Sequence, residues 1–286
     1  MNQNINLNGL ITKTTPFIEI LKLKSSTFDL ATIIITCSIL AKIDFRAGLL
    51  LLWGMMVHCG GDVINDIYDR DIDRICKPNS PIASGRMSVR TAWIYTGILY
   101  SASIVIASLL NTICVLISIL GIVIGGFLYS HPRFRIKDHP ILSITSLAMC
   151  FALETIGVWS IYAPVAINTF IVSFYVFVLT FSLIFFKDFR DIKGDKNSLP
   201  LMLGIKKAAI VVSVLSILPA LAMLCLLFFY KTIAIFLAIM VYIPIAISTI
   251  RILLDDPVAN SQKLRSRMYL MVSAPAFMLF LVTFLF

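Results

Sequence analysis

The sequence predicts an all-α integral membrane protein, a nine-transmembrane-helix bundle, and three observations lead to that prediction. Hydrophobic residues make up 59% of the 286 residues and charged residues only 14%, whereas a soluble globular domain carries roughly 25% charged residues. The mean hydropathy is +0.95. The apolar residues gather in runs that are too long and too uniform for barrel strands, so helices are the expected spanning elements.

The first four apolar spans are separated by short polar breaks. The first ends just after Lys42, and the second ends where an acidic stretch begins. Leu110-Asn111 separates the third from the fourth, which ends at a basic stretch from Arg133 to Lys137. The expected spans are 27–43, 45–64, 89–109 and 112–129.

The last five spans follow the same pattern. The sixth ends at a second acidic stretch, Lys231 separates the seventh from the eighth, and a basic stretch precedes the ninth. These spans are 140–159, 165–186, 207–229, 232–250 and 268–286. We expect one transmembrane domain over residues 1–286, in which the loops 65–88 and 187–206 carry the acidic motifs.

The distribution of basic residues predicts the orientation in the membrane. Of the 24 Lys and Arg residues, 21 fall before the first span or in the loops after spans 2, 4, 6 and 8. Only Lys42, Arg46 and Lys231 fall on the other side. The positive-inside rule therefore predicts a cytoplasmic N-terminus, a cytoplasmic-side active site and a C-terminus outside the cell membrane. The net charge of +9 follows from this bias and does not indicate nucleic-acid binding.

Two matched acidic motifs stand at span ends on that side. Residues 66–73 and residues 188–195 both read D-x-x-D-x-x-x-D. In a helix this spacing places three carboxylates on one face. Each motif is followed by a Pro-x-x-x-Gly unit, Pro81 to Gly85 and Pro200 to Gly204. The sequence thus predicts a duplicated helix–loop–helix element whose two copies face one cavity.

Carboxylates beside a membrane core indicate function, because burying them is costly. Mg²⁺ prefers carboxylate oxygens together with substrate phosphates, so two acidic motifs predict Mg²⁺ ions that hold a diphosphate. The expected metal ligands are Asn65, Asp66, Asp69, Asp73, Asp188, Asp191 and Asp195. The expected catalytic residues among them are Asp66, Asp69, Asp191 and Asp195. The basic Lys22, Arg86 and Lys187 are candidates to bind the diphosphate.

Several other side chains are open to two interpretations. His58 lies seven residues before Asn65 on one helix face, and it either lines the cavity or is a hydrogen-bonded structural residue. Trp53, Tyr68, Tyr129 and Tyr175 either stabilise a carbocation through their π faces or mark the membrane interface.

The motifs resemble those of a known family. Asn65-Asp66-x-x-Asp69-x-x-x-Asp73 with the stretch from Lys77 to Ser88 resembles the signature of the UbiA superfamily of intramembrane aromatic prenyltransferases. Residues 187–196 are similar to that family's second aspartate motif, and Tyr129 with Arg133 to Lys137 is similar to its Tyr-and-Lys loop. Within the superfamily, the stretch from Lys77 to Ser88 is most similar to the branch that makes digeranylgeranylglyceryl phosphate.

The resemblance implies a fold and a reaction. It implies a nine-helix bundle, Mg²⁺ holding an isoprenoid diphosphate, ionisation to an allylic cation, and attack by a lipophilic or phosphorylated acceptor inside the lipid bilayer. It also implies that Tyr129 and Lys137 bind the diphosphate.

The sequence departs from the family pattern at Ser80, where Arg is usual, at Ala83, where Pro is usual, and at Lys22, where Arg is usual. These departures leave two alternatives to prenyl transfer open. One is a terpene cyclase of the same superfamily, which needs no acceptor. The other is a transporter, although the acids cluster at one membrane face and not at its centre. The acceptor, the chain length and the oligomeric state are not predicted.

Overall fold

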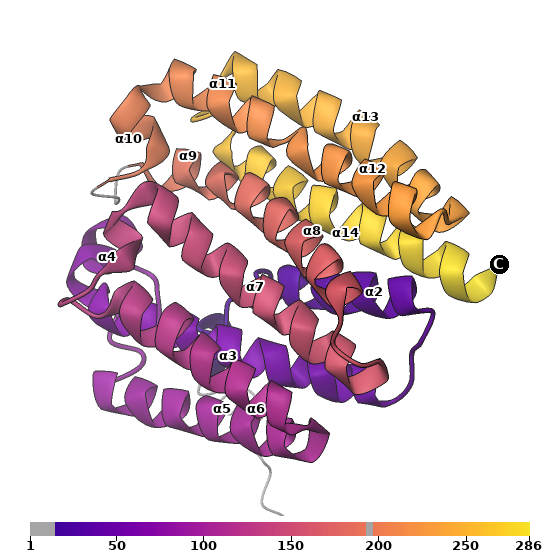
Figure 1. Ribbon diagram of the computed structural model, residues 1–286. Helices are drawn as coiled ribbons and strands as arrows, with labels where there is room; N and C mark the ends of the chain where they lie inside the picture. The colour runs from indigo at the N-terminus through magenta and orange to yellow at the C-terminus, as the bar shows by residue number, and fades with distance from the viewer. Residues whose placement is uncertain (1–14, 193–196) are drawn as a thin grey trace, which may run out of the picture.

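Helices running side by side dominate the computed structural model, which describes residues 15–192 and 197–286 (Figure 1). No strand occurs within these two ranges. The first half contains α2 (Thr27–Leu40), α3 (Arg46–Tyr68), α4 (Arg70–Cys76), α5 (Val89–Leu110), α6 (Thr112–Gly121), the π-helix η1 (Ile122–Leu128), the short η2 (Ile136–Asp138) and α7 (Pro140–Tyr162). The second half contains α8 (Ile167–Ile184), η3 (Phe185–Lys187), α9 (Asp188–Asp191), α10 (Leu199–Leu203), α11 (Ile205–Leu215), α12 (Leu218–Tyr230), α13 (Ile233–Asp255) and α14 (Ser261–Leu285).

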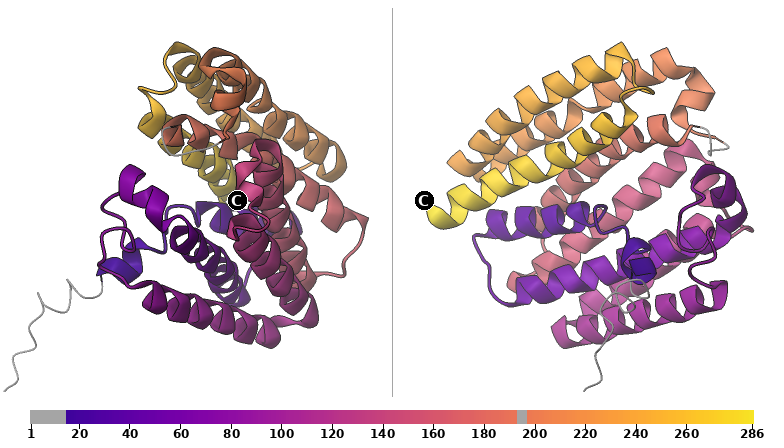
Figure 2. Two further views of the ribbon diagram at one scale, coloured as in Figure 1. Left: turned by 90° about the vertical axis from the view of Figure 1, so that its left-hand side faces the viewer. Right: turned by 180° about the vertical axis from the view of Figure 1, so that it is seen from behind.

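The long helices form a closed ring in chain order. Each packs on the next, from α2 through α3, α5, α6, α7, α8, α12 and α13 to α14, and α14 packs back against α2. α2 also packs on α7 across the ring. The two views of Figure 2 show the helices inclined to one another around a shared interior. The largest core cluster lies in the C-terminal half, where Phe185, Phe186 and Tyr242 are fully buried.

Among the described residues, seven helical segments are long and apolar enough to cross a membrane, when α8, η3 and α9 are counted as one segment and α11 and α12 as another. The other two apolar helices, 27–40 and 112–128, are shorter. At 1.5 Å per residue they extend about 21 and 26 Å, against about 30 Å of hydrocarbon. The protein is therefore an integral membrane protein, and the expectation of nine spans stays a prediction.

Most predicted span boundaries lie close to the helix ends, with four corrections. α13 continues past residue 250 to Asp255, and α14 begins at Ser261 instead of 268. α3 continues past residue 64 to Tyr68, so Asn65 and Asp66 belong to the helix and not to the loop. The expected span 207–229 starts at Ile205 and is divided at Ser216-Ile217, just before Pro219 at the start of α12. Pro219 has no N–H to donate, so it favours a new helix start there.

Polar residues at the breaks cap the helices that follow them. The Ser88 side chain accepts a hydrogen bond from the Thr91 backbone N–H at 3.0 Å, at the start of α5. Asn111 does the same for Cys114 at 2.9 Å and so separates α5 from α6. Such caps satisfy backbone donors that have no partner inside the helix.

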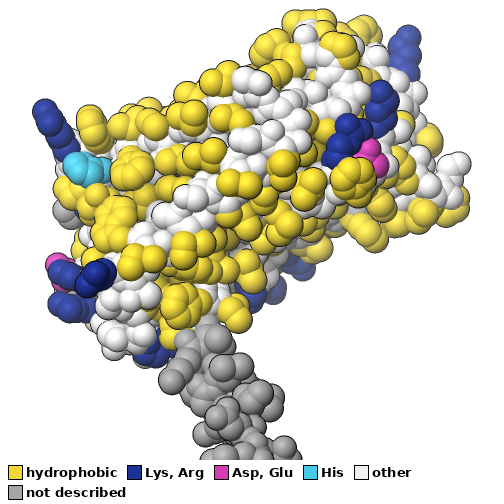
Figure 3. Space-filling view, turned by 90° about the horizontal axis from the view of Figure 1, so that it is seen from below, with side chains coloured by type: hydrophobic (Ala, Val, Ile, Leu, Met, Phe, Trp, Pro, Cys, Tyr) yellow, Lys and Arg dark blue, Asp and Glu magenta, His cyan; other side chains and the backbone are white. Residues whose placement is uncertain are grey.

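The outer surface matches an apolar solvent. Hydrophobic side chains cover the middle of the face seen in Figure 3, and basic side chains gather towards its two ends. Exposed residues along the helices include Ile98, Leu109 and Phe228. This pattern is typical of a protein whose middle lies among lipid chains.

The duplicated element is visible in the backbone. α4, which carries the end of the first motif, and α9, which begins the second, lie at one end of the bundle, opposite the C-terminus (Figure 1). The Gly residues that close the two Pro-x-x-x-Gly units, Gly85 and Gly204, have φ of +78° and +80°. Each stands shortly before a long helix, α5 or α11. Glycine adopts positive φ without the steric cost that other residues bear.

We predict that Gly85→Ala and Gly204→Ala each destabilise the protein by about 1 kcal/mol, because alanine resists positive φ. Thermal unfolding of the purified variants measures this. Gly97→Ala is the matched control, since a Cβ there meets nothing within 4 Å and no positive φ is involved. It should be neutral or stabilising. Unchanged unfolding temperatures in both loop variants would contradict the role of the two glycines.

Candidate functional site

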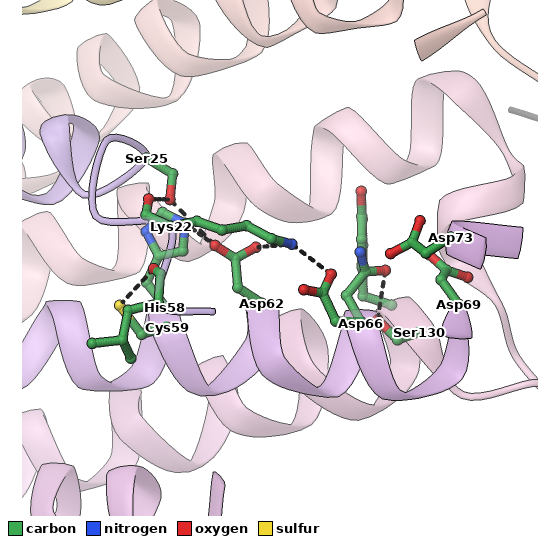
Figure 4. A network of polar contacts seen from close by, with 12 residues as sticks. Lys22, Ser25, His58, Cys59, Asp62, Asp66, Asp69, Asp73 and Ser130 are labelled. Carbon is green, nitrogen blue, oxygen red and sulfur yellow. Dashed lines mark hydrogen bonds and ion pairs between the residues drawn. The ribbon is translucent and has the colours of Figure 1, made fainter. Parts of the chain in front are cut away.

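The polar face of α3 forms one wall of the site. His58, Asp62 and Asp66 follow one another at intervals of four residues and so lie along one side of the helix (Figure 4). α3 ends at Tyr68, and Asp69 joins it to α4 with φ −92° and ψ 3°. The expected single helix under the first motif is thus two helices. Backbone hydrogen bonds from Asp69 to Asn65 and from Asp73 to Asp69 keep them nearly continuous.

Lys22 compensates the charge of the buried Asp66. Its ammonium lies 2.7 Å from Oδ1 of Asp66 and 3.9 Å from Oδ1 of Asp62 (Figure 4). Burial alone would lower the pKa of Lys22, but Asp62 and Asp66 outweigh it and raise that pKa above its usual range. Lys22 also has φ of +48°, a conformation that costs a non-glycine residue energy and concentrates at functional sites.

A second pair of cations compensates Asp69. The Lys137 ammonium forms an ion pair with Asp69 and donates to Oδ1 of Asn65 at 2.7 Å. The Arg135 guanidinium lies 3.4 Å from Asp69. Burial lowers the pKa of Lys137, although the carboxylate of Asp69 opposes this. The folded protein therefore binds the Lys137 proton less tightly than the unfolded chain does, and this part of the stability increases as pH rises towards about 10.4.

Asp73 provides an oxygen suited to a cation. Its side chain is buried, Oδ1 lies 3.3 Å from the Lys77 ammonium, and Oδ2 has no hydrogen-bond partner. A carboxylate oxygen without a hydrogen-bond partner is costly to bury unless a bound ligand or ion supplies the missing contact. Among the described residues, no three His, Cys, Asp or Glu side chains converge as metal ligands. Mg²⁺ usually takes only one or two carboxylates besides phosphates and water, so the residues fit an ion that arrives with a diphosphate.

Part of the second motif can be placed. Asp188 is buried, and its Oδ2 accepts a hydrogen bond from the Leu199 backbone N–H at 3.4 Å. Lys187 contacts the hydroxyl of Tyr129 at 3.2 Å. The side chain of Asp191 and the whole of Asp195 lie outside the described residues, so their expected roles stay predictions.

Two cavities meet among these residues. The polar one, about 640 Å³, is lined by Asp69, Asp73, Lys137 and Asp188. The more apolar one, about 450 Å³, extends between the helices towards Trp53 and Ile117. Both linings share Asn65, Lys77, Tyr129, Lys187 and Arg190. A charged chamber at the bundle end therefore adjoins an apolar chamber inside the bundle.

Some expected residues lie elsewhere. Arg86 is in neither lining and instead pairs with Glu19, whose pKa this hydrogen bond lowers, and with the carbonyl of Asn79. Tyr68 packs on Trp93 and His131, and Tyr175 borders a separate small cavity.

Trp53, His58 and Tyr129 do line the apolar cavity. His58 is also hydrogen-bonded, to Asp29 at 2.8 Å, so both of its interpretations hold at once.

The structure adds four residues that the motifs did not single out. Asp62 stands one helical turn before Asp66, a spacing that the sequence does show. Arg135 lies in the loop that carries Lys137. Asp29 and Glu154 are buried acids of α2 and α7 in the apolar lining. The sequence does show both as isolated acidic residues within predicted spans, a pattern that indicates function.

Comparisons with known proteins agree with the resemblance. Residues 30–285 match the model of the UbiA prenyltransferase family. A digeranylgeranylglyceryl phosphate synthase of Methanosphaera stadtmanae is 30% identical over 235 residues, which are 80% of this chain and 83% of that protein. A 2-acylphloroglucinol 4-prenyltransferase of Humulus lupulus is 34% identical over 166 residues, 54% of this chain and 39% of that protein.

A solved structure shares the fold. The UbiA homolog of Archaeoglobus fulgidus, bound to GPP and Mg²⁺, superposes with a TM-score of 0.69 at 21% identity, covering 93% of this chain and 99% of that one.

We predict that Lys22→Met destabilises the protein by about 1–3 kcal/mol, because the buried carboxylate of Asp66 would lose its nearest hydrogen-bonding cation. Thermal unfolding without Mg²⁺ measures the loss. The double variant Lys22→Met/Asp66→Asn removes both charges and should recover most of it. A double variant no more stable than the single one would show that the ion pair is not what Lys22 contributes.

Proposed function

The chain belongs to the UbiA prenyltransferase family, and on that premise we propose that it transfers a polyprenyl group from an isoprenoid diphosphate to a hydroxyl or aromatic acceptor within the membrane, with Mg²⁺ as cofactor. The observation that carries the proposal is the junction of the two cavities. One is lined by acids and bases and the other largely by apolar side chains. An isoprenoid diphosphate has the same two parts, a charged head and an apolar tail.

The residues of the polar cavity have complementary tasks in this proposal. Mg²⁺ would be held by Asn65, Asp66, Asp69, Asp73, Asp188, Asp191 and Asp195, and when bound it neutralises charge on the diphosphate. Lys187 and Tyr129 stand where the two cavities meet, so they would orient the diphosphate at the bond that breaks. Lys22 and Lys137 would exchange part of their contact with the acids for contact with phosphate oxygens.

The reaction conserves charge and atoms. The bond between the allylic carbon and the diphosphate oxygen breaks, and the electron pair leaves with the diphosphate. An acceptor oxygen or aromatic carbon forms the new bond to the allylic carbon and then loses a proton. Fixed cations around the leaving group lower the barrier because they match the charge that develops there.

The names of two relatives support the proposed acceptor class. A glyceryl phosphate product and an acylphloroglucinol acceptor are named for the two curated relatives. Both names fit nucleophiles that carry hydroxyl groups. We propose that this chain takes such an acceptor from the membrane, with the active site on the cytoplasmic side as the basic residues favour.

Cyclisation of the prenyl diphosphate is the second candidate, because the apolar cavity carries aromatic walls from Phe28, Trp53 and Phe151. Incubation of the purified protein with C10 to C20 diphosphates and Mg²⁺, without acceptor, separates the two reactions. A cyclic product would support the cyclase. Diphosphate release that requires an added phenol or glycerol phosphate would support the transferase.

We predict that EDTA abolishes diphosphate release and that Mg²⁺ restores it. Asp66→Asn and Asp73→Asn should each lower the rate by at least about a hundredfold, and the double variant should lose little more, because residues that act as one unit are non-additive. Asp71→Asn is the matched control, since Asp71 is exposed and pairs with Arg70 and Arg74. Full turnover in chelator, or near-normal rates in both variants, would exclude the metal site.

The proposed orientation makes a separate prediction. Cys76 is exposed at the end of α4, so a membrane-impermeant thiol reagent should label it only after the cells are opened. A cysteine placed at Lys231 should show the opposite behaviour, and Cys76→Ser supplies the background. Labelling of Cys76 in intact cells would reverse the topology.

A further inference from the structure

Three ionisable side chains gather in the apolar cavity, away from the acidic motifs. Asp29 of α2, His58 of α3 and Glu154 of α7 all border it. Asp29 is 2% exposed and Glu154 is 6% exposed. Oδ2 of Asp29 lies 2.8 Å from Nδ1 of His58, and the other ring nitrogen of His58 lies 3.9 Å from Asp62. Buried acids within apolar helices are costly and point to a function.

Glu154 lacks a partner on one side. Its Oε1 is buried and makes no hydrogen bond with the described residues. It leans over Gly54, where an added Cβ would overlap Oε1 and stand 3.5 Å from Oδ1 of Asp29. Glycine at position 54 therefore leaves room for two carboxylate oxygens side by side at the cavity wall. Two buried carboxylates this close cannot both be charged, so they share one proton and their remaining oxygens act as hydrogen-bond acceptors.

The cluster is too deep to belong to the diphosphate site. Gly54 precedes Asp66 by twelve residues on α3, which corresponds to about 18 Å along the helix. His58 precedes it by eight residues, or about 12 Å. A diphosphate held at Asp66 does not reach these groups. The cavity lining between them includes apolar side chains such as Val57 and Leu147 and, nearer Asp66, the polar Asp62 and Lys22.

We propose that Asp29, His58 and Glu154 form a binding site for a hydroxyl group on an apolar ligand, placed at the inner end of the cavity. Oε1 of Glu154 has no donor among the described residues, and His58 is already engaged by Asp29. A phenol or an alcohol supplies one O–H donor, and the apolar part of the same ligand packs against the apolar side chains of the cavity wall. The hydroxyl site does not rest on the proposed function, and it lies too far from Asp66 for its hydroxyl to be the oxygen that attacks the allylic carbon.

Binding to the full chain in lipid nanodiscs tests the site without turnover. The probes are 4-hexylphenol and 4-hexylanisole, which differ in that the ether cannot donate a hydrogen bond. We expect the phenol to bind severalfold more tightly than the ether, as one additional hydrogen bond in a buried site implies. Glu154→Gln and Asp29→Asn should each shrink this ratio severalfold, and Asp71→Asn should leave it unchanged.

Further binding measurements test the hydroxyl site separately from the proposed transfer reaction. If the wild-type protein binds both probes equally, or binds 4-hexylbenzylamine more tightly than the phenol, the hydroxyl site is wrong, even if no variant can be purified. Asp66→Asn should lose prenyl diphosphate binding but keep the phenol preference. Failure of the proposed transfer reaction and failure of this site therefore give different results.

Discussion

Carboxylates at the edge of a membrane must be compensated, and this constraint organises the site. Asp66 lies on α3 at a depth where burial disfavours its charge, and the ammonium of Lys22 lies 2.7 Å away. To reach it, the chain before α2 folds back with Lys22 at positive φ. Asp69 requires Lys137 and Arg135 in the same way, and they come from a loop between η1 and α7. The cations tie separate segments to one end of α3.

This arrangement explains why the two cavities meet where they do. The cations and acids line the chamber at the bundle end, and the apolar chamber begins where α3 enters the bundle interior. Tyr129 and Lys187 belong to both linings and contact each other. Tyr129 directly follows η1 and Lys187 ends η3, and the two side chains lie between the polar and the apolar chamber. A molecule with a charged head and an apolar tail satisfies both chambers at once.

Much of the architecture was predictable from the sequence, because hydrophobic runs and capping residues are local signals. Asn111 marks a helix boundary through its own side chain, and the glycines of the repeat mark turns. The pairing of Lys22 with Asp66, or of His58 with Asp29, was not predictable, because these partners are 44 and 29 residues apart. Asp62 was overlooked although it stands one turn before the motif. The pairing of Arg86 with Glu19 was not predictable either, because these partners are 67 residues apart, and the expected role of Arg86 stays a prediction.

The order of the ring has a consequence for biogenesis. Neighbours in the ring are also neighbours in the chain, except at the contact between α2 and α14. Because synthesis proceeds from the N-terminus, Asp29 and His58 meet early, on two consecutive helices, and can neutralise each other in the membrane. Glu154 follows only with α7, and the walls from Met268 and Tyr269 come last with α14. The inner chamber thus stays open to lipid until the final helix is inserted, and the noncovalent contact of α2 with α14 completes its enclosure.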